Sequence, residues 1–146
     1  ALLLLAAAAE DAARLRISNL TVGLVLIAAI AAAVIAGPEL GLWQNAAVFA
    51  ALLALGTPLF AAGKLGGGDV KLLAATGLWF DIEGAGWMLL YVFLTGGVLA
   101  LAIIAARALR WSERVRQRVA VLRPKSGIPY GIAIAAGALI AIALQR

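Results

Sequence analysis

The chain has 146 residues, of which 65% are hydrophobic and 13% charged, with a mean hydropathy of +1.07 and a net charge of +5. Because soluble domains carry about 25% charged residues, this composition excludes a water-soluble globule and predicts an all-α, polytopic membrane helical bundle forming one domain over residues 1–146. The chain contains no cysteine and no histidine, which excludes disulfides, Cys/His zinc sites and Ser-His or Cys-His catalytic pairs.

The first apolar run covers residues 1–9 and is too short to cross a membrane alone. As a helix it extends for about 13 Å at about 1.5 Å per residue, which is less than half of a hydrocarbon core of about 30 Å. Since the chain begins with Ala1 and not with Met, we expect further residues upstream of it. A remnant of a secretory signal is the alternative, although no basic segment precedes the run.

Five further apolar segments follow, separated by polar junctions or glycine-containing turns. Two of them begin at a tryptophan, Trp43 and Trp87, a residue enriched at membrane interfaces. It is doubtful whether residues 70–80 cross the membrane, because they extend for only about 16 Å as a helix. The other four segments cover residues 20–36, 43–63, 87–106 and 128–144.

The distribution of basic residues favours six crossings. With six, eleven of the twelve Lys and Arg residues fall on one side, in the junctions 10–19 and 64–71 and in the loop 107–125. Since cytoplasmic loops of membrane proteins are enriched in Lys and Arg, we predict that these loops are cytoplasmic and that both ends of the chain lie outside. We interpret the positive charge as topology and contact with anionic lipid headgroups, not as a nucleic-acid site.

Asp69 is the first candidate for chemistry, because it follows three glycines in an otherwise apolar stretch. Glycine allows backbone conformations closed to other residues, and ionisable groups at membrane depth are costly and usually functional. The predicted topology leaves Glu10 and Asp11 as its acidic partners on the same face. The other acids are interpreted as turn or surface residues: Glu39, Asp81 and Glu83 in outer turns, and Glu113 in a salt-bridged turn with Arg110, Arg114 and Arg116.

Two carboxylates from different helices at the membrane boundary can hydrolyse a peptide bond without a metal or a cofactor. One ionised carboxylate takes a proton from water while its neutral neighbour polarises the carbonyl, because like charges a few Å apart do not both ionise easily. In the alternative interpretation, Asp11 neutralises Arg14 or Arg16 and Asp69 caps the helix that follows it. Composition and topology leave both interpretations open.

Three stretches resemble the type IV prepilin leader peptidases. The stretch from Asp11 to Asn19, which ends in Arg-Ile-Ser-Asn, is similar to the first conserved block of that family, with Ser18 where the family often has proline. Residues 66–72, Gly-Gly-Gly-Asp-Val-Lys-Leu, resemble its Gly-x-Gly-Asp-x-Lys-Leu block, whose core is shared with intramembrane aspartyl proteases. Residues 128–131, Ile-Pro-Tyr-Gly, resemble the segment that opens the family's last helix.

The resemblance implies that Asp11 and Asp69 are the catalytic pair. We expect Gly66 and Gly68 to let an extended substrate backbone approach Asp69. By the same resemblance, the supporting residues of the two blocks are Arg16, Asn19, Gly66, Gly68 and Lys71, and the residues that line the cleft or the substrate path are Pro129, Tyr130 and Gly131.

The resemblance also implies a fold, a location and a substrate. The fold is a six-segment bundle similar to the GxGD aspartyl proteases, in the bacterial inner membrane, with the active site at the cytoplasmic face. The substrates are prepilin-like proteins whose basic cytoplasmic leader is removed, and no cofactor or metal takes part. The short, cysteine-free chain resembles the peptidase-only form of Flp-type tight-adherence pilus systems, which lacks the methylating part.

Helix dipoles predict how the pair shares its proton. Asp69 precedes a predicted helix, whose N-terminal end favours an anion, and Asp11 follows one, whose C-terminal end favours the neutral acid. Asp69 is therefore predicted to act as the base and Asp11 as the acid, although Arg14 and Arg16 oppose this assignment. Two other functions stay open: a non-enzymatic transporter or pilus-assembly component that uses Asp69 as an ion or proton site, and a protease for other membrane substrates.

Overall fold

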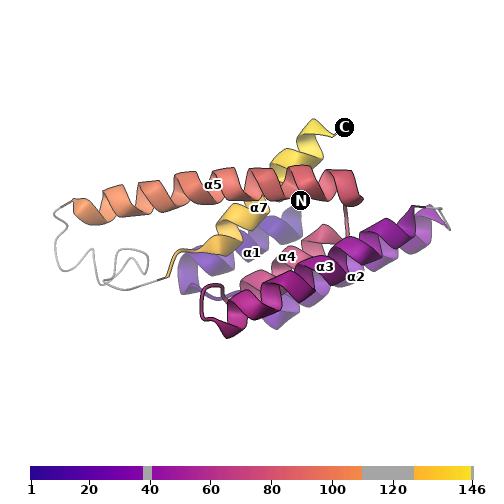
Figure 1. Cartoon of the computed structure of the whole chain (residues 1–146), viewed down its shortest axis with the longest axis horizontal. Helices are drawn as coiled ribbons and strands as arrows, with labels where there is room; N and C mark the ends of the chain where they lie inside the picture. Colours follow the sequence, from indigo (N-terminus) through magenta and orange to yellow (C-terminus); the bar gives the residue numbers. More distant parts are fainter. Residues whose placement is uncertain (38–40, 110–126, 146) are drawn as a thin grey trace.

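A computed structural model describes residues 1–37, 41–109 and 127–145. In these residues the chain is helical, without a strand, which confirms the predicted all-α class. The helices are α1 (Leu2–Arg14), α2 (Asn19–Ala36), α3 (Leu42–Ala61), α4 (Gly67–Gly77), α5 (Ile82–Ala108) and α7 (Tyr130–Leu144), arranged as Figure 1 shows.

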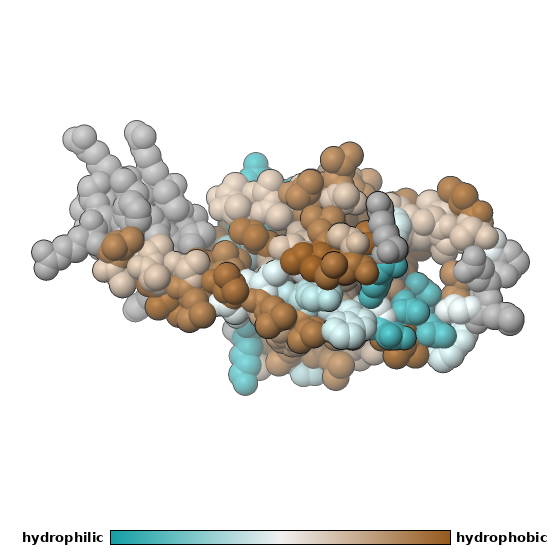
Figure 2. Space-filling model, turned by 90° about the horizontal axis from the view of Figure 1, so that it is seen from above, coloured by the Kyte–Doolittle hydropathy of each residue, from teal (hydrophilic) through white to brown (hydrophobic). Residues whose placement is uncertain are grey.

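Three of these helices, α2, α3 and α5, are long and apolar enough to cross a membrane. Their outer faces carry large exposed apolar side chains, such as Ile35 at 85% and Phe93 at 74% exposure. Hydrophobic residues also cover much of the face shown in Figure 2. Because lipid is the solvent that favours such a surface, the structure agrees with a helical membrane protein. That α1, α4 and α7 also cross stays a prediction.

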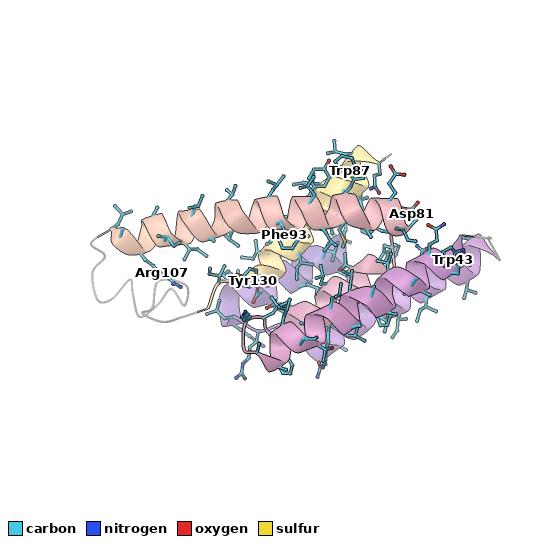
Figure 3. The ribbon with its side chains drawn as sticks, viewed as in Figure 1. Trp43, Asp81, Trp87, Phe93, Arg107 and Tyr130 are labelled. Carbon is cyan, nitrogen blue, oxygen red and sulfur yellow. The ribbon has the colours of Figure 1, made fainter. Side chains whose placement is uncertain are left out.

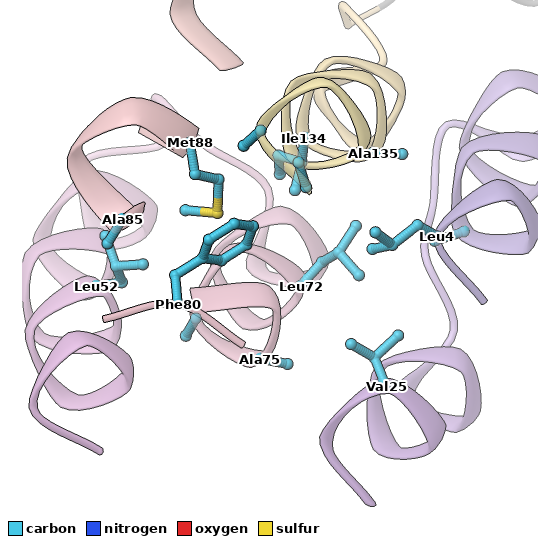
Figure 4. Packing of buried hydrophobic residues seen from close by; sticks show 14 of the residues in the cluster. Leu4, Val25, Leu52, Leu72, Ala75, Phe80, Ala85, Met88, Ile134 and Ala135 are labelled. Carbon is cyan, nitrogen blue, oxygen red and sulfur yellow. The ribbon is translucent and has the colours of Figure 1, made fainter. Parts of the chain in front are cut away.

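Helix α4 lies at the centre of the bundle. It packs against α2, α3 and α7, while α5 packs mainly against α7, and α1 packs against α7 and α2. Figure 4 shows Leu72 of α4 between Leu4, Val25 and Ile134, which belong to three different helices. Leu72 is fully buried, so the short helix is surrounded by protein, a setting in which membrane proteins tolerate an incomplete span.

Close helix contacts depend on small residues. A Cβ atom added to Gly137 of α7 would overlap the backbone of Val92 in α5, and one added to Gly56 of α3 would lie 2.5 Å from Val70 of α4. The hydroxyl of Thr95 in α5 donates a 3.1 Å hydrogen bond to the carbonyl of Ala133 in α7. Small residues and such hydrogen bonds hold helices together where lipid removes the usual hydrophobic driving force.

The largest differences between the helices and the predicted segments are at the end of α1 and the start of α5. Helix α1 continues beyond residue 9 to Arg14, because Ala12 and Ala13 favour helix and Arg14 suits the negative end of the dipole. Helix α5 begins at Ile82 and absorbs most of the predicted turn. Asp81 caps it by accepting a 2.7 Å hydrogen bond from the N–H of Gly84.

Several sequence predictions fall outside the described residues. These concern the turn at Glu39 and the basic part of the loop from residue 110 onward, including Glu113 and its arginine neighbours. The lipid contacts predicted for that loop therefore stay predictions.

Candidate active site

Asp11 and Asp69 open onto one cavity of about 450 Å³. They are brought there from the last turn of α1 and the first turn of α4. The structure thus brings the two acids, from separate helices, to the lining of the same cavity. The cavity is lined by Asp11, Leu15, Arg16, Ile17, Phe60, Gly66, Gly67, Gly68 and Asp69.

The acid at the start of α5 lies away from this cavity. Figure 3 shows Asp81 at the same end of the bundle as Trp43, whereas Tyr130 lies toward the opposite end, near Arg107. Tyr130 directly precedes Gly131, which contacts Asp11. The charge pattern predicted that Asp81 lies at the opposite end of the bundle from Asp11 and Asp69, and the fold agrees with this prediction.

Asp11 is buried, with 3% of its side chain exposed, and is held by the beginning of α7. Its Oδ2 atom accepts a 2.7 Å hydrogen bond from the backbone N–H of Gly131, and the N–H of Ile132 also acts on the carboxylate. A helix N-terminus favours a negative charge through these N–H groups and its dipole. Asp11 therefore lies against an anion-binding helix end that the sequence analysis did not foresee.

Asp69 is half-buried and is the third residue of α4. The N-cap of α4 is Gly66, whose N–H donates to the Asp69 carboxylate. A Cβ on Gly66 would lie 2.7 Å from Oδ2 of Asp69. Gly66 thus makes room for the carboxylate itself. Asp69 is not the N-cap, but its contact with the N–H of Gly66 is a capping contact, so this part of the alternative interpretation stays open.

Both carboxyl groups lie in the polar junctions, outside the apolar segments. Their surroundings favour a state in which the two carboxyl groups together carry one proton. Burial raises the pKa of Asp69, and the charge of Asp11 raises it further, to about 6. Burial also raises the pKa of Asp11, but the N–H groups of Gly131 and Ile132 act against that rise. These hydrogen bonds favour an ionised Asp11 and a protonated Asp69, the reverse of the assignment predicted from helix dipoles.

Gly68 and Gly131 both pack against Ile17. A Cβ on Gly68 would lie 3.2 Å from Cβ of Ile17, and one on Gly131 would lie 2.7 Å from its Cδ1. The near neighbour of Gly68 is thus the chain's own turn between α1 and α2. Gly68 also lines the cavity of the aspartates, and its predicted role, to admit a substrate backbone, stays a prediction.

Two supporting residues of the sequence motifs contact each other. The Nζ atom of Lys71 donates a 3.1 Å hydrogen bond to Oδ1 of Asn19. This contact joins the start of α2 to the start of α4, but neither residue lines the cavity, whereas Arg16 does.

Of residues 129–131, which were predicted to line the cleft or the substrate path, one contacts a catalytic candidate. Gly131 contacts Asp11, while Pro129 is the buried N-cap of α7 and Tyr130 is 37% exposed. None of the three residues is in the lining of the cavity.

Sequence reasoning did not anticipate the parts played by Leu15 and Phe60. Leu15 ends α1 in the left-handed conformation at φ 52°, which is strained for a residue with a side chain. Phe60 of α3 lies against Gly67, whose added Cβ would be 3.1 Å from the ring. A second cavity of about 190 Å³ shares Phe60 and Gly67 with the first. Neither residue stands out in an apolar sequence.

A metal site is not found in the part of the chain that the structure describes, since no three Asp or Glu side chains gather there. The carboxylate pair has the composition needed to activate water directly.

Comparison with known proteins gave one match. A family model described as the type IV leader peptidase family (Peptidase_A24) matches residues 1–104, a range that includes both aspartates. No curated protein and no solved structure matched the chain.

Proposed function

The chain belongs to the type IV leader peptidase family, and from that premise we propose that it is a membrane aspartic endopeptidase that removes the basic leader of prepilin-like proteins. The observation that carries the proposal is the shared cavity of Asp11 and Asp69. Membership in a peptidase family favours this function over a transporter or a non-enzymatic assembly component.

The proposed reaction uses the two carboxyl groups in different protonation states. Ionised Asp11 takes a proton from a water molecule, and the water oxygen bonds to the scissile carbonyl carbon. Protonated Asp69 donates a hydrogen bond to the carbonyl oxygen and stabilises the charge that develops there. The proton on Asp11 then passes to the amide nitrogen as the C–N bond breaks, which leaves a leader carboxyl group and a new N-terminal amine.

The second cavity suggests where the substrate lies. It is lined by Leu53, Thr57, Phe60, Gly67, Val70 and Lys71. Because it shares Phe60 and Gly67 with the cavity of the aspartates, we propose that it receives an apolar side chain next to the scissile bond. Such a side chain is available where a polar leader meets a hydrophobic helix.

The proposed location is the bacterial inner membrane, with the aspartates at the cytoplasmic face. Four basic residues lie in the junctions that also hold the aspartates: Arg14, Arg16, Lys64 and Lys71. This position follows from the enrichment of Lys and Arg on the cytoplasmic side. Within the family we propose Flp-like prepilins as the substrates.

Co-expression with candidate substrates tests the proposed specificity. The chain is produced with a Flp-like prepilin or with a protein carrying an ordinary secretory signal, and the product's N-terminus is determined by mass spectrometry. We expect one new N-terminus, at the junction of leader and apolar helix, only with the prepilin. Cleavage of the secretory signal alone would assign the chain to a different substrate class, and no cleavage of either would contradict the proposal.

A further inference from the structure

Glu10, next to Asp11, makes a set of contacts that the proposed reaction does not use. Its carboxylate accepts hydrogen bonds from the backbone N–H of Ser18 at 2.9 Å, from the Ser18 hydroxyl at 3.3 Å and from the Thr21 hydroxyl at 2.9 Å. Ser18 is also the N-cap of α2, since its hydroxyl accepts from the N–H of Thr21 at 3.1 Å. These donors lower the pKa of Glu10 and keep it ionised.

These hydrogen bonds close the turn between α1 and α2. The turn needs such support because Leu15 adopts a left-handed conformation, which costs about 1–2 kcal/mol in a residue other than glycine. Hydrogen bonds to a charged acceptor are stronger than neutral ones. The Glu10 carboxylate thus holds the far side of the turn, from Ser18 to Thr21, against the end of α1.

Ile17, at the centre of this turn, touches the surroundings of both aspartates. It packs against Gly68, which precedes Asp69, and against Gly131, which donates to Asp11. A Cβ on Gly68 would also lie 3.3 Å from the carbonyl oxygen of Ile17. The starts of α4 and α7 therefore both rest on this one residue.

We infer that Glu10 is a positioning residue, which fixes the α1–α2 turn and, through Ile17, sets the separation of the Asp11 and Asp69 carboxyl groups. The inference rests on the proposed function, because that function gives the separation of the two carboxyl groups its purpose. Glu10, the acid next to Asp11 in the sequence, thereby has a role outside the proposed reaction.

Thr21 offers a matched pair of variants that leaves the Glu10 charge in place. Thr21→Val keeps the shape of the buried side chain and removes the hydroxyl, while Thr21→Ser keeps the hydroxyl and removes a methyl group. We expect Thr21→Val to lower kcat about tenfold with KM unchanged, because small displacements of reacting groups are costly, and Thr21→Ser to retain kcat. Wild-type kcat in Thr21→Val, per folded molecule, would overturn the inference, as would a larger loss in Thr21→Ser.

A second measurement does not depend on cleavage. The chain has no cysteine, so two introduced cysteines can pair only with each other within one molecule. In the double variant Ile17→Cys with Gly68→Cys, the rate of disulfide formation reports the position of the turn, because a disulfide requires close Cβ atoms. We expect Glu10→Ala to slow this rate about tenfold or more relative to Glu83→Gln, an acid substitution in the first turn of α5. An unchanged rate would overturn the role of Glu10. If Glu10→Ala slows disulfide formation but the unsubstituted chain cleaves no prepilin, the proposed function is contradicted. The dependence of the turn on Glu10 would still hold.

Discussion

The backbone N–H of Gly131 donates a 2.7 Å hydrogen bond to Oδ2 of Asp11, which lies 120 positions earlier in the chain. This bond places the N-terminus of α7 against a buried carboxylate. Because N–H groups at a helix N-terminus stabilise an anion, the contact opposes the rise in the pKa of Asp11 that burial causes. The last helix therefore belongs to the candidate active site although none of its residues carries a reactive group there.

Substituting Gly131 is expected to disable the site. In Gly131→Ala the new Cβ would lie 2.8 Å from Oδ2 of Asp11 and 2.7 Å from Cδ1 of Ile17. Since a displacement of about 1 Å at a catalytic group costs about a hundredfold in rate, we expect a loss of that size in kcat. Gly97→Ala is the control, because a Cβ at Gly97 meets no atom within 4 Å. Equal activity of the two variants, measured by prepilin cleavage, would argue against the role of Gly131.

The rate of cleavage is expected to fall as the pH rises through about 6. In the proposed reaction the active form carries a proton on Asp69, whose pKa is raised to about 6 by burial and by the charge of Asp11. Above that pH both carboxyl groups are ionised and neither can donate to the carbonyl oxygen, so kcat/KM should drop about tenfold per pH unit. A pH profile in detergent with one prepilin substrate measures this. A rate that stays constant from pH 5 to pH 8 would contradict the shared proton.

The contact between Lys71 and Asn19 is expected to have a modest effect. Both side chains are exposed, and even an exposed pair of opposite charges contributes only about 0.2–1 kcal/mol, so this hydrogen bond to a neutral amide contributes no more. Lys71→Met and Asn19→Ala should each lower kcat/KM about threefold, and the double variant should be no worse than either one. Lys64→Met, an exposed lysine in the same junction, serves as control. Additive losses would show that the two residues act separately.

Filling the second cavity is expected to weaken substrate binding. Thr57→Trp introduces a large side chain into the cavity that adjoins the aspartates, and we expect KM to rise about tenfold with a smaller change in kcat. Val98→Trp is a matched control, because Val98 is an exposed position in an apolar cavity between α5 and α7. If Val98→Trp raised KM and Thr57→Trp did not, the substrate would approach from the α5–α7 side.

The sequence predicted the elements of the site better than their contacts. Asp11 and Asp69 stood out because carboxylates are rare in so apolar a chain, and the charge pattern placed them on one face. The contact of Gly131 with Asp11 depends on how α7 packs against α1, which no local pattern records. The packing of Gly68 against Ile17 was not foreseen for the same reason, since the two residues meet only in the folded bundle. The early start of α5 followed from the Asp81 cap, a signal that was present in the sequence but was interpreted as a turn.

Replacing each aspartate separately shows whether Asp11 and Asp69 together carry the reaction. The kcat of purified Asp11→Asn and Asp69→Asn is compared with that of the wild type and of Glu83→Gln, which alters an acid at the start of α5. Because one group must accept a proton and the other must donate a hydrogen bond, we expect either Asn variant to lose cleavage by at least about a thousandfold, while Glu83→Gln keeps it. Substantial cleavage by either Asn variant would contradict a reaction carried by the Asp11 and Asp69 pair.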